Sequence, residues 1–228
     1  MSTVDLVIMA GGEGRRLEPF TKVVPKPLLY VDGQSILERT IQFFRAQGFA
    51  QRVFILTWYK SELIQAYINV SGLSHVELVV EDEPLGTIGG IGLLRDRLSP
   101  TFFVSNCDIV IETDLNELMK NFREKQLDLS MCAFSKPIAV PYGIFEFDDD
   151  GYVTNLVEKP TIKLWANAGV YLMSRRVFEY ITPGQRMNMD ELFYSMMNSD
   201  MNLDVFPLDG FHDIGEFQYY KKVLEELC

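Results

Sequence analysis

Residues 9–28, MAGGEGRRLEPFTKVVPKPL, hold the groups best suited to chemistry, and they follow an apolar run from Val4 to Met9. The glycines at positions 11, 12 and 14 carry no Cβ, so this backbone can turn tightly and bring its N–H groups against a ligand. Four basic and two acidic residues lie in the stretch, whereas the whole chain has a net charge of −11. This combination predicts a loop that binds an anionic group such as phosphate.

Two common phosphate-binding motifs are excluded by the glycine pattern. A P-loop needs Gly-Lys-Ser/Thr after its glycines, and the dinucleotide fingerprint needs a third glycine where this chain has Leu17. The missing third glycine also disfavours an NAD-binding oxidoreductase.

A longer string gives a more specific match. It comprises Gly11, Gly12, Gly14, Arg16, Leu17, Pro19, Thr21, Pro25, Lys26 and Pro27. The string resembles the signature of the sugar-1-phosphate nucleotidylyltransferases, G-G-x-G-x-R-L-x-P-x-T followed by P-K-P. Arg15 departs from the small Thr or Ser of many members, and the sequence leaves open whether it reaches the ligand or points to water. The resemblance implies catalytic roles for Arg16 and Lys26, and nucleotide binding by Ala10, Gly11, Gly12 and Gly14.

Strand and helix patterns alternate in the first half of the chain. Apolar runs at 4–9, 52–57 and 75–80 predict strands, helices begin at Ser35 and Ser61, and a further strand is expected at 101–105. Ser35 and Glu38 have capping-box spacing, and Gly48 suits the end of that helix. Such alternation predicts a parallel sheet covered on both faces, with ligands at the carboxyl ends of its strands.

The pattern changes in the second half. Asp114 can cap a helix, and the segments 144–147 and 152–157 predict a hairpin with Asp-Gly in its turn. A strand at 167–173, a short helix capped by Ser174, and helices at 190–197 and 216–227 follow. We expect an α/β fold: a Rossmann-like three-layer α/β/α arrangement of the nucleotide-diphospho-sugar transferase type, with a mixed, mainly parallel central sheet, in one domain spanning residues 1–228.

Composition narrows the class of protein. The apolar fraction of 47% and the charged fraction of 23% are ordinary for a soluble globular chain, and no uncharged stretch is long and apolar enough for membrane insertion. A pI near 4.7 disfavours nucleic-acid binding, which needs a basic surface. The start lacks a signal-peptide pattern, and three cysteines without metal-ligand spacing fit a reducing cytoplasm.

Two aspartates are candidate metal ligands. Asp108 follows the strand at 101–105, and Asp213 precedes the last predicted helix. Either one alone would more often be a cap or turn residue. Asn106-x-Asp108 and Asp213-Ile214-Gly215 resemble the N-G-D and D-I-G motifs that hold magnesium in this family, although Cys107 replaces the glycine, which requires a negative φ there. Mg²⁺ favours one or two carboxylates with phosphate oxygens and water, so we expect it as the cofactor.

Three further motifs carry the sugar side of the resemblance. Tyr142-Gly143, Glu158-Lys159-Pro160 and Asn167-x-Gly169 resemble the Y-G, E-K-P and N-x-G motifs that contact the hexose and its phosphate. Any one of them would more often be structural. Their occurrence in the family's order favours sugar-phosphate binding by Tyr142, Gly143, Glu158, Lys159 and Asn167.

The run Glu81 to Thr87 bears on the base. Thymidylyl and uridylyl members carry Gln at the position of Glu81, and Gln both donates and accepts, as a pyrimidine edge requires. A carboxylate only accepts, which suits the two adjacent donors of guanine. Glu81, Pro84, Gly86 and Thr87 are therefore candidate nucleotide-binding residues, with GTP favoured and UTP or dTTP as alternatives. The competing interpretation is a solvated acidic loop.

Together these features predict a metal-dependent nucleotidylyltransferase that condenses an NTP with a sugar 1-phosphate to give an NDP-sugar and pyrophosphate. The alternative is a catalytically silent regulatory subunit that binds a nucleotide sugar. The sequence does not identify the sugar, and it leaves open whether the chain forms a homo-oligomer.

Overall fold

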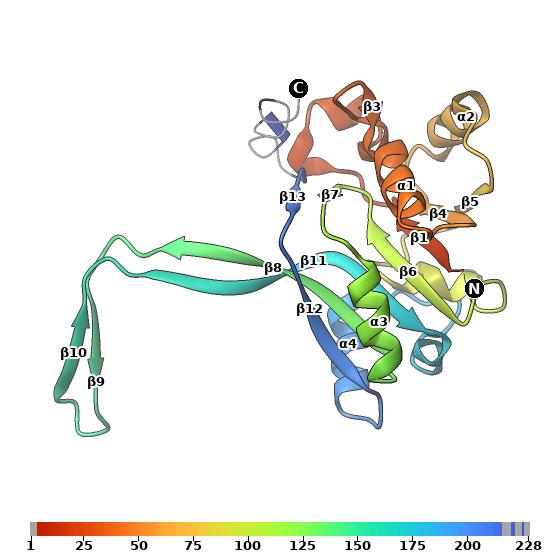
Figure 1. Ribbon diagram of the computed structural model, residues 1–228. Helices are drawn as coiled ribbons and strands as arrows, with labels where there is room; N and C mark the ends of the chain where they lie inside the picture. The colour runs from red at the N-terminus through yellow and green to blue at the C-terminus, as the bar shows by residue number, and fades with distance from the viewer. Residues whose placement is uncertain (1–3, 216–219, 222–224, 226–228) are drawn as a thin grey trace.

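A seven-stranded sheet forms the centre of the computed structural model, which describes residues 4–215, 220, 221 and 225 (Figure 1). The strand order is β12-β8-β11-β6-β1-β4-β5. Its members are β1 (Asp5–Met9), β4 (Val53–Thr57), β5 (Val76–Val80), β6 (Thr101–Asn106), β8 (Leu129–Ala139), β11 (Thr161–Ser174) and β12 (Leu203–Leu208). β11 alone runs antiparallel to its neighbours, and all other pairs in this sheet are parallel. The expected mixed, mainly parallel sheet is confirmed.

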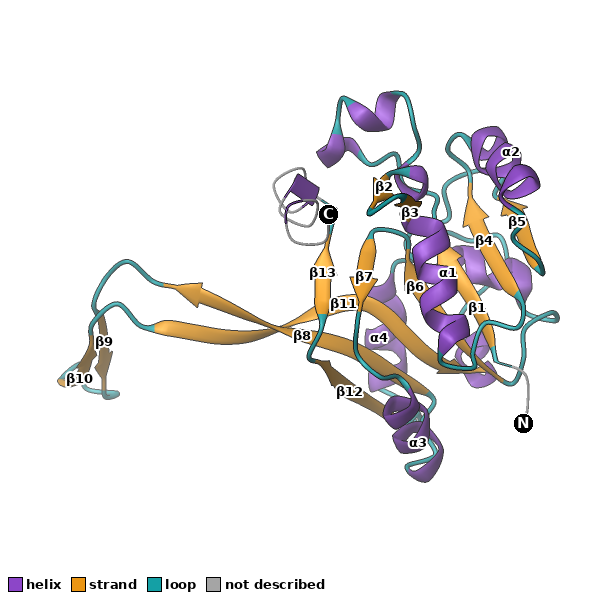
Figure 2. Ribbon diagram, turned by 45° about the horizontal axis from the view of Figure 1, so that its top comes forward, coloured by secondary structure: helices purple, strands orange, loops and turns teal. Residues whose placement is uncertain are grey.

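Helices cover both faces of the sheet, as the alternating pattern predicts (Figure 2). One face carries α1 (Ile36–Ala46), α2 (Ser61–Ser71) and α3 (Asn116–Glu124). The other carries α4 (Met189–Met197) and the 3-10 helices η4 (Gly89–Leu94) and η5 (Arg175–Glu179). Strand β1 serves both layers, because side chains alternate along a strand: Leu6 and Ile8 enter the first core and Val7 the second.

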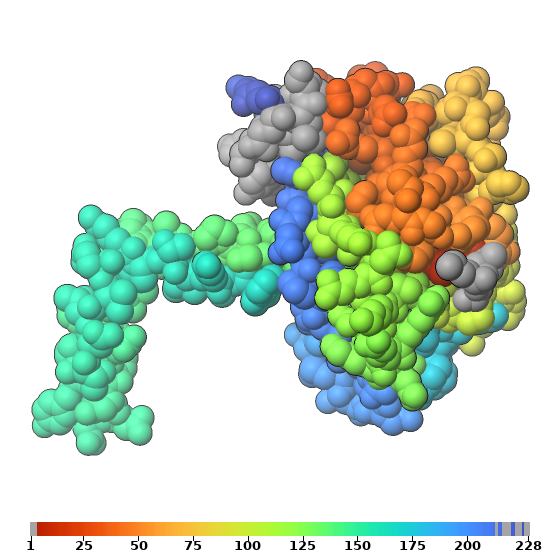
Figure 3. Space-filling model, in the orientation of Figure 1, coloured from red at the N-terminus to blue at the C-terminus, as the bar shows by residue number. Residues whose placement is uncertain are grey.

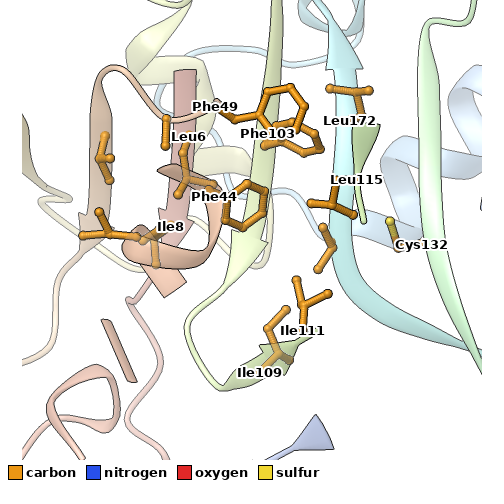
Figure 4. Packing of buried hydrophobic residues seen from close by; sticks show 14 of the residues in the cluster. Leu6, Ile8, Phe44, Phe49, Phe103, Ile109, Ile111, Leu115, Cys132 and Leu172 are labelled. Carbon is orange, nitrogen blue, oxygen red and sulfur yellow. The ribbon is translucent and has the colours of Figure 1, made fainter. Parts of the chain in front are cut away.

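Three phenylalanine rings pack together within the mainly aliphatic first core (Figure 4). The ring of Phe103 in β6 lies 5.0 Å, centroid to centroid, from the rings of both Phe44 and Phe49. Phe44 and Phe103 are fully buried, so together they fix α1 against the central strands. Burial of such rings is a leading favourable contribution to folding.

The predicted helix ends are supported by specific hydrogen bonds. The Ser35 hydroxyl accepts from the Glu38 N–H at 3.1 Å, and Gly48 has φ of +84° just beyond α1. The expected cap at Asp114 is shifted, because Leu115 is the N-cap of α3, but the Asp114 carboxylate accepts from the Asn116 N–H at 2.9 Å, which lowers the pKa of Asp114. Ser174 accepts from the Arg176 N–H at the start of η5. The expected helix at 216–227 lies mainly outside the described residues.

Several short elements complete the body. β2 (Tyr30–Val31) pairs with β3 (Gln34–Ser35), and β7 (Ile109–Ile111) pairs antiparallel with β13 (Phe211–Asp213). The 3-10 helices η1 (Arg15–Leu17), η2 (Phe20–Lys22) and η3 (Lys26–Leu28) shape the glycine-rich stretch. Among the described residues, no helix has both the length and the apolar character of a membrane span.

A long two-stranded ribbon projects from the sheet. β8 and β11 stay paired from Ala133 and Asn167 out to Ala139 and Thr161, and the hairpin of β9 (Ile144–Phe147) and β10 (Val153–Val157) lies beyond them. Residues 135–165, here called the arm, stand clear of the body in the space-filling view (Figure 3). The hairpin is as predicted, with Gly151 at φ of +85° in its turn.

Candidate active site

A pocket of about 500 Å³ opens where the central parallel strands end. Met9, Trp58, Glu81 and Asn106 line it at or just after the ends of β1, β4, β5 and β6, as expected for such a sheet. It gathers nearly all of the predicted catalytic and nucleotide-binding residues and one predicted metal ligand: Gly11, Gly12, Gly14, Arg16, Lys26, Glu81, Pro84, Gly86, Thr87 and Asp108. Ala10 is the exception, because it is buried beneath the pocket with its N–H donated to the Leu56 carbonyl.

The glycine-rich loop is closed by Gly14 and Thr21. Gly14 has φ of +69°, and a Cβ there would lie 2.7 Å from Cγ2 of Thr21. The Thr21 hydroxyl donates to the Gly14 carbonyl at 2.9 Å. Leu17, which lies between these two residues in the sequence, has a fully buried side chain. A Cβ on Gly12, by contrast, would meet no atom within 4 Å. The loop is therefore anchored on one side and leaves open space at Gly12.

Arg15 and Arg16 both line the pocket. The Arg15 side chain is 79% exposed, and its Nε donates to the Glu13 carboxylate at 2.6 Å, which raises the pKa of Arg15. The structure thus places the Arg15 guanidinium at the solvent edge, where Glu13 holds it.

Lys26 lies on the floor of the pocket. Its side chain is 9% exposed, and its Nζ donates to Oδ2 of Asp108, whose side chain is 15% exposed. The flanking prolines explain the rigid placement: Pro25 is extended, and the Leu28 N–H donates to its carbonyl at 2.9 Å to close the turn of η3. The nearly buried Lys26 ammonium group is thereby held beside the Asp108 carboxylate, near the end of the glycine-rich stretch 9–28.

The two predicted metal ligands lie close together in the chain fold: Asp108 is in the bend between β6 and β7, and Asp213 is in β13, which pairs with β7. Asp213 in β13 is paired with Ile109, the residue after Asp108, and the Ile214 N–H donates to the Asp108 carbonyl at 3.0 Å. Cys107 lies outside the left-handed region, which satisfies the condition for replacing glycine. Among the described residues no three His, Cys, Asp or Glu side chains form a metal cluster, and the Asp213 side chain is not described. The Asp108 carboxylate fits an ion such as Mg²⁺ that takes few protein ligands.

Glu81 is not part of a solvated acidic loop, because it is only 5% exposed, unlike Asp82 and Glu83 beside it. Its Oε2 accepts from the Leu85 N–H at 3.1 Å, and a Cβ on Gly90 would lie 2.2 Å from its Oε1. Burial raises the pKa of Glu81, and the Leu85 hydrogen bond offsets this in part. The pocket wall therefore holds a nearly buried carboxylate.

Four of the predicted sugar-side residues lie together on the arm, away from this pocket. A Cβ on Gly143 would lie 2.9 Å from Oε2 of Glu158, and Lys159 Nζ lies 3.8 Å from Oε1 of Glu158. Tyr142 is 73% exposed, and the side chains of Glu158 and Lys159 are each 69% exposed. None of the four lines the pocket of its own chain.

Asn167 lies at the opposite end of the ribbon. Its Oδ1 accepts from the Gly169 N–H at 2.9 Å, and its Nδ2 donates to the Tyr171 hydroxyl at 2.8 Å. Gly169 has φ of +71°, and a Cβ there would lie 2.3 Å from Nδ2 of Asn106. Because Asn106 lines the pocket, the Asn167-x-Gly169 motif abuts it.

Three pocket residues were not anticipated: Trp58, Arg186 and Asn188. Trp58 directly follows β4, so it could have been predicted in the same way as Asp108, which was chosen because it follows a predicted strand. Arg186 had no such signal. Its segment is held by the Ile88 and Gly89 N–H groups, which both donate to the Met187 carbonyl at 3.1 Å, although about a hundred residues separate the partners.

A comparison with protein families decides the relationship. The family model described as nucleotidyl transferase matches residues 6–228. The chain belongs to the nucleotidyl transferase family. The resemblance to sugar-1-phosphate nucleotidylyltransferases is thereby confirmed, and curated relatives carry such names.

Two curated relatives show how far this nucleotidyl transferase resembles named proteins. Mannose-1-phosphate guanylyltransferase of Mycobacterium tuberculosis is 29% identical over 211 residues, which cover 89% of this chain and 58% of the relative. The mannose-1-phosphate guanylyltransferase catalytic subunit beta of Drosophila pseudoobscura pseudoobscura is 30% identical over 219 residues, which cover 92% of this chain and 58% of the relative. This chain therefore spans a little over half the length of these relatives.

A solved structure matches this nucleotidyl transferase over its whole length. HddC of Yersinia pseudotuberculosis is 28% identical, with a TM-score of 0.76, and the match covers 99% of this chain and 100% of that one. The same protein has also been solved in complex with GMP-PN.

Proposed function

We propose that this chain is a sugar-1-phosphate nucleotidylyltransferase. A phosphate oxygen of the sugar 1-phosphate attacks the α-phosphorus of the NTP, the bond to the bridging oxygen breaks, and pyrophosphate leaves with the electron pair. The observation that carries the proposal is the buried Lys26 beside Asp108, at the end of a glycine-rich loop with open space at Gly12.

The role of each pocket residue follows from its position relative to the phosphate groups. The loop amides and Arg16 bind the β- and γ-phosphates, and Lys26 contacts the α-phosphate and the sugar phosphate. Both reactants are polyanions, so most of the catalytic work is to position them and to neutralise charge that moves toward the leaving group. Asp108 and Asp213 are the residues that would hold Mg²⁺. When bound, it would supply positive charge to the phosphate oxygens.

We further propose GTP as the nucleotide. Glu81 supports this, because its nearly buried carboxylate keeps Oε1 free of the Leu85 hydrogen bond that occupies Oε2. The two adjacent donors of guanine fit a group that only accepts. Two guanylyltransferases and a GMP-PN complex among the similar proteins point the same way.

The cytoplasm is the proposed compartment. Cys107 and Cys132 are free and buried, and burial raises the pKa of Cys107 to about 12. Unpaired thiols of this kind suit a reducing environment.

The test is pyrophosphate release by the purified chain with Mg²⁺, each of ATP, GTP, CTP, UTP and dTTP, and a panel of hexose and heptose 1-phosphates. Release with GTP and one sugar phosphate supports both proposals. Release with UTP or dTTP alone keeps the transferase and rejects the guanine assignment. Tight nucleotide binding without release across the panel contradicts the enzyme and favours the silent regulatory subunit.

A further inference from the structure

The arm exposes an unusual share of apolar surface. More than half of the exposed large hydrophobic side chains among the described residues lie on it, although it is a small part of the chain. These residues are Ile138, Tyr142, Phe145, Phe147, Tyr152, Val153, Leu156, Val157, Ile162, Leu164 and Trp165. A concentration of this kind marks a surface that another molecule covers.

The hairpin at the end of the arm has one distinctly apolar face. Phe145 lies opposite Leu156, and Phe147 lies opposite Val153, so the four side chains share one side. Each of the four is more than half exposed. A two-stranded hairpin is marginally stable by itself in water, so this face needs a partner to hold it in shape.

The sugar-side motifs are divided between the two ends of the ribbon. Asn167 abuts the pocket through Gly169, whereas Lys159 lies beyond Thr161 at the far end. The seven residues from Thr161 to Asn167 are continuously paired with β8, and the six steps between them, at about 3.3 Å each, span roughly 20 Å. A lysine side chain is much shorter than that span, so Lys159 does not serve the pocket of its own chain in this arrangement.

We propose that two copies of the chain pair through their arms, and that each arm brings Lys159, Glu158 and Tyr142 to the sugar-phosphate side of the partner's pocket. The inference rests on the proposed function for the role of these residues. A two-fold axis would complete both sites at once, because each copy offers one pocket and one arm. The apolar face of the hairpin would be buried in the same contact.

Cross-linking tests the arrangement without any need for activity. The full chain with Lys159→p-benzoyl-phenylalanine is irradiated, and the products are separated by mass and mapped by peptide sequencing. We expect a band at twice the chain mass, with the cross-link in the segments 9–28 or 106–108. A cross-link only within one chain would overturn the inference.

The oligomeric state gives a second, independent measurement. Wild-type protein at tens of micromolar should have the mass of a dimer by light scattering. The double variant Phe145→Ser/Leu156→Ser should be a monomer with the wild-type circular dichroism spectrum. Tyr194→Ser is the matched control, since Tyr194 is 59% exposed on α4 and outside the arm, and it should stay a dimer. A wild-type monomer, or a dimer that survives the arm variant, would contradict the pairing.

Complementation identifies which chain completes the site. Lys26→Ala and Lys159→Ala chains with different tags are co-expressed, and the heterodimer is purified by both tags. In this heterodimer the pocket of the Lys159→Ala chain keeps Lys26 and receives the arm of the Lys26→Ala chain, which keeps Lys159. One of the two sites is therefore complete, so the heterodimer should release pyrophosphate at about half the wild-type rate. A heterodimer as inactive as either homodimer would show that the arm serves its own chain. If wild-type protein releases no pyrophosphate at all, the proposed function fails, while the cross-link still decides the arrangement.

Discussion

Lys26 Nζ donates to Asp108 Oδ2 across the floor of the pocket, although 82 residues separate the two in sequence. Each of these groups is nearly buried, so removing one leaves the other charge poorly compensated. Substrate phosphates would give Lys26 a second anionic partner. The pair therefore links the first loop of the chain to the end of β6 at the point where we place the chemistry.

Replacement of Lys26 by Met should abolish most of the activity in a protein that still folds but is less stable, because Asp108 loses its partner. A preorganised charge at a reacting phosphate is worth about 100- to 1,000-fold in rate, so pyrophosphate release should fall by that amount. Lys22→Met is the control, because Lys22 is 66% exposed and pairs with Glu18 on the same stretch. A Lys26→Met rate above half of wild type would refute the assignment.

Asp108→Asn should lose activity to the same extent, about 100- to 1,000-fold, since an amide binds a divalent cation less well than a carboxylate does. The variant should also need more Mg²⁺ for half-maximal rate. Magnesium titrations of wild type and variant measure this, and an unchanged magnesium requirement would exclude Asp108 as a ligand.

Glu81→Gln should change the base preference. Two hydrogen bonds from guanine to a charged acceptor would be weakened, which corresponds to roughly a 10- to 100-fold loss in kcat/KM for GTP. Gln offers a donor and an acceptor, so the ratio of UTP to GTP turnover should rise. Competition between the two nucleotides measures that ratio. The same ratio in wild type and variant would show that Glu81 does not recognise the base.

The same variant should be more stable than wild type at neutral pH without ligand. Burial raises the pKa of Glu81 above the ordinary value of 4.5, so the folded state favours the protonated acid and is penalised once the pH rises above that value. Glu81→Gln removes this penalty and keeps an acceptor for the Leu85 N–H. We expect a Tm higher by a few degrees at pH 7.5, with the difference shrinking below pH 4.5, where both states of wild type are protonated. A variant less stable at pH 7.5 would contradict the argument.

Two glycines of the loop should respond differently to alanine. Gly14→Ala forces a Cβ against Thr21 at φ of +69°, and the left-handed conformation alone costs about 1–2 kcal/mol, so Tm should fall. Gly12→Ala meets no protein atom within 4 Å, so Tm should be unchanged. The added methyl would occupy ligand space instead, and an overpacking cost of about 1–3 kcal/mol would raise KM for the NTP roughly 5- to 150-fold. Equal effects of both variants on Tm would refute this division of roles.

Trp58 should report nucleotide binding directly. A Cβ on Gly11 would lie 3.3 Å from Cδ1 of Trp58, so the indole forms the wall beside the loop. Titration with GTP should change tryptophan emission in a saturable way. The only other tryptophan is Trp165 on the arm, so Trp165→Phe should keep the response and Trp58→Phe should lose it. A response that survives Trp58→Phe would place the nucleotide elsewhere.

The ends of the strands predicted from the sequence correctly indicated where the pocket lies. The parallel strands at β1, β5 and β6 could be predicted because their apolar runs alternate with capped helices, and their ends delivered Gly11, Glu81 and Asp108 to one pocket. The identity of the ligands that these residues bind stays a prediction.

The arm could not be predicted in the same way. Strand β8 mixes apolar residues with Ser135, Lys136 and Pro137, so its pattern is weak, and no local motif indicates that it pairs with β11 over such a length. Motif order alone placed Lys159 beside the pocket. The direction of a ribbon depends on strand pairing between distant residues, and a local motif does not encode that pairing.

The central position of β1 also constrains how the chain is made. β1 leaves the ribosome well before β6, which is one of its two neighbours in the sheet and pairs Asn106 with Met9. Until β6 emerges, the nascent sheet of β1, β4 and β5 presents an open apolar edge, which invites pairing with other chains. The pocket floor is thus completed only after β6 has been synthesised, and a product that ends before Thr101 should depend on a chaperone to remain unaggregated.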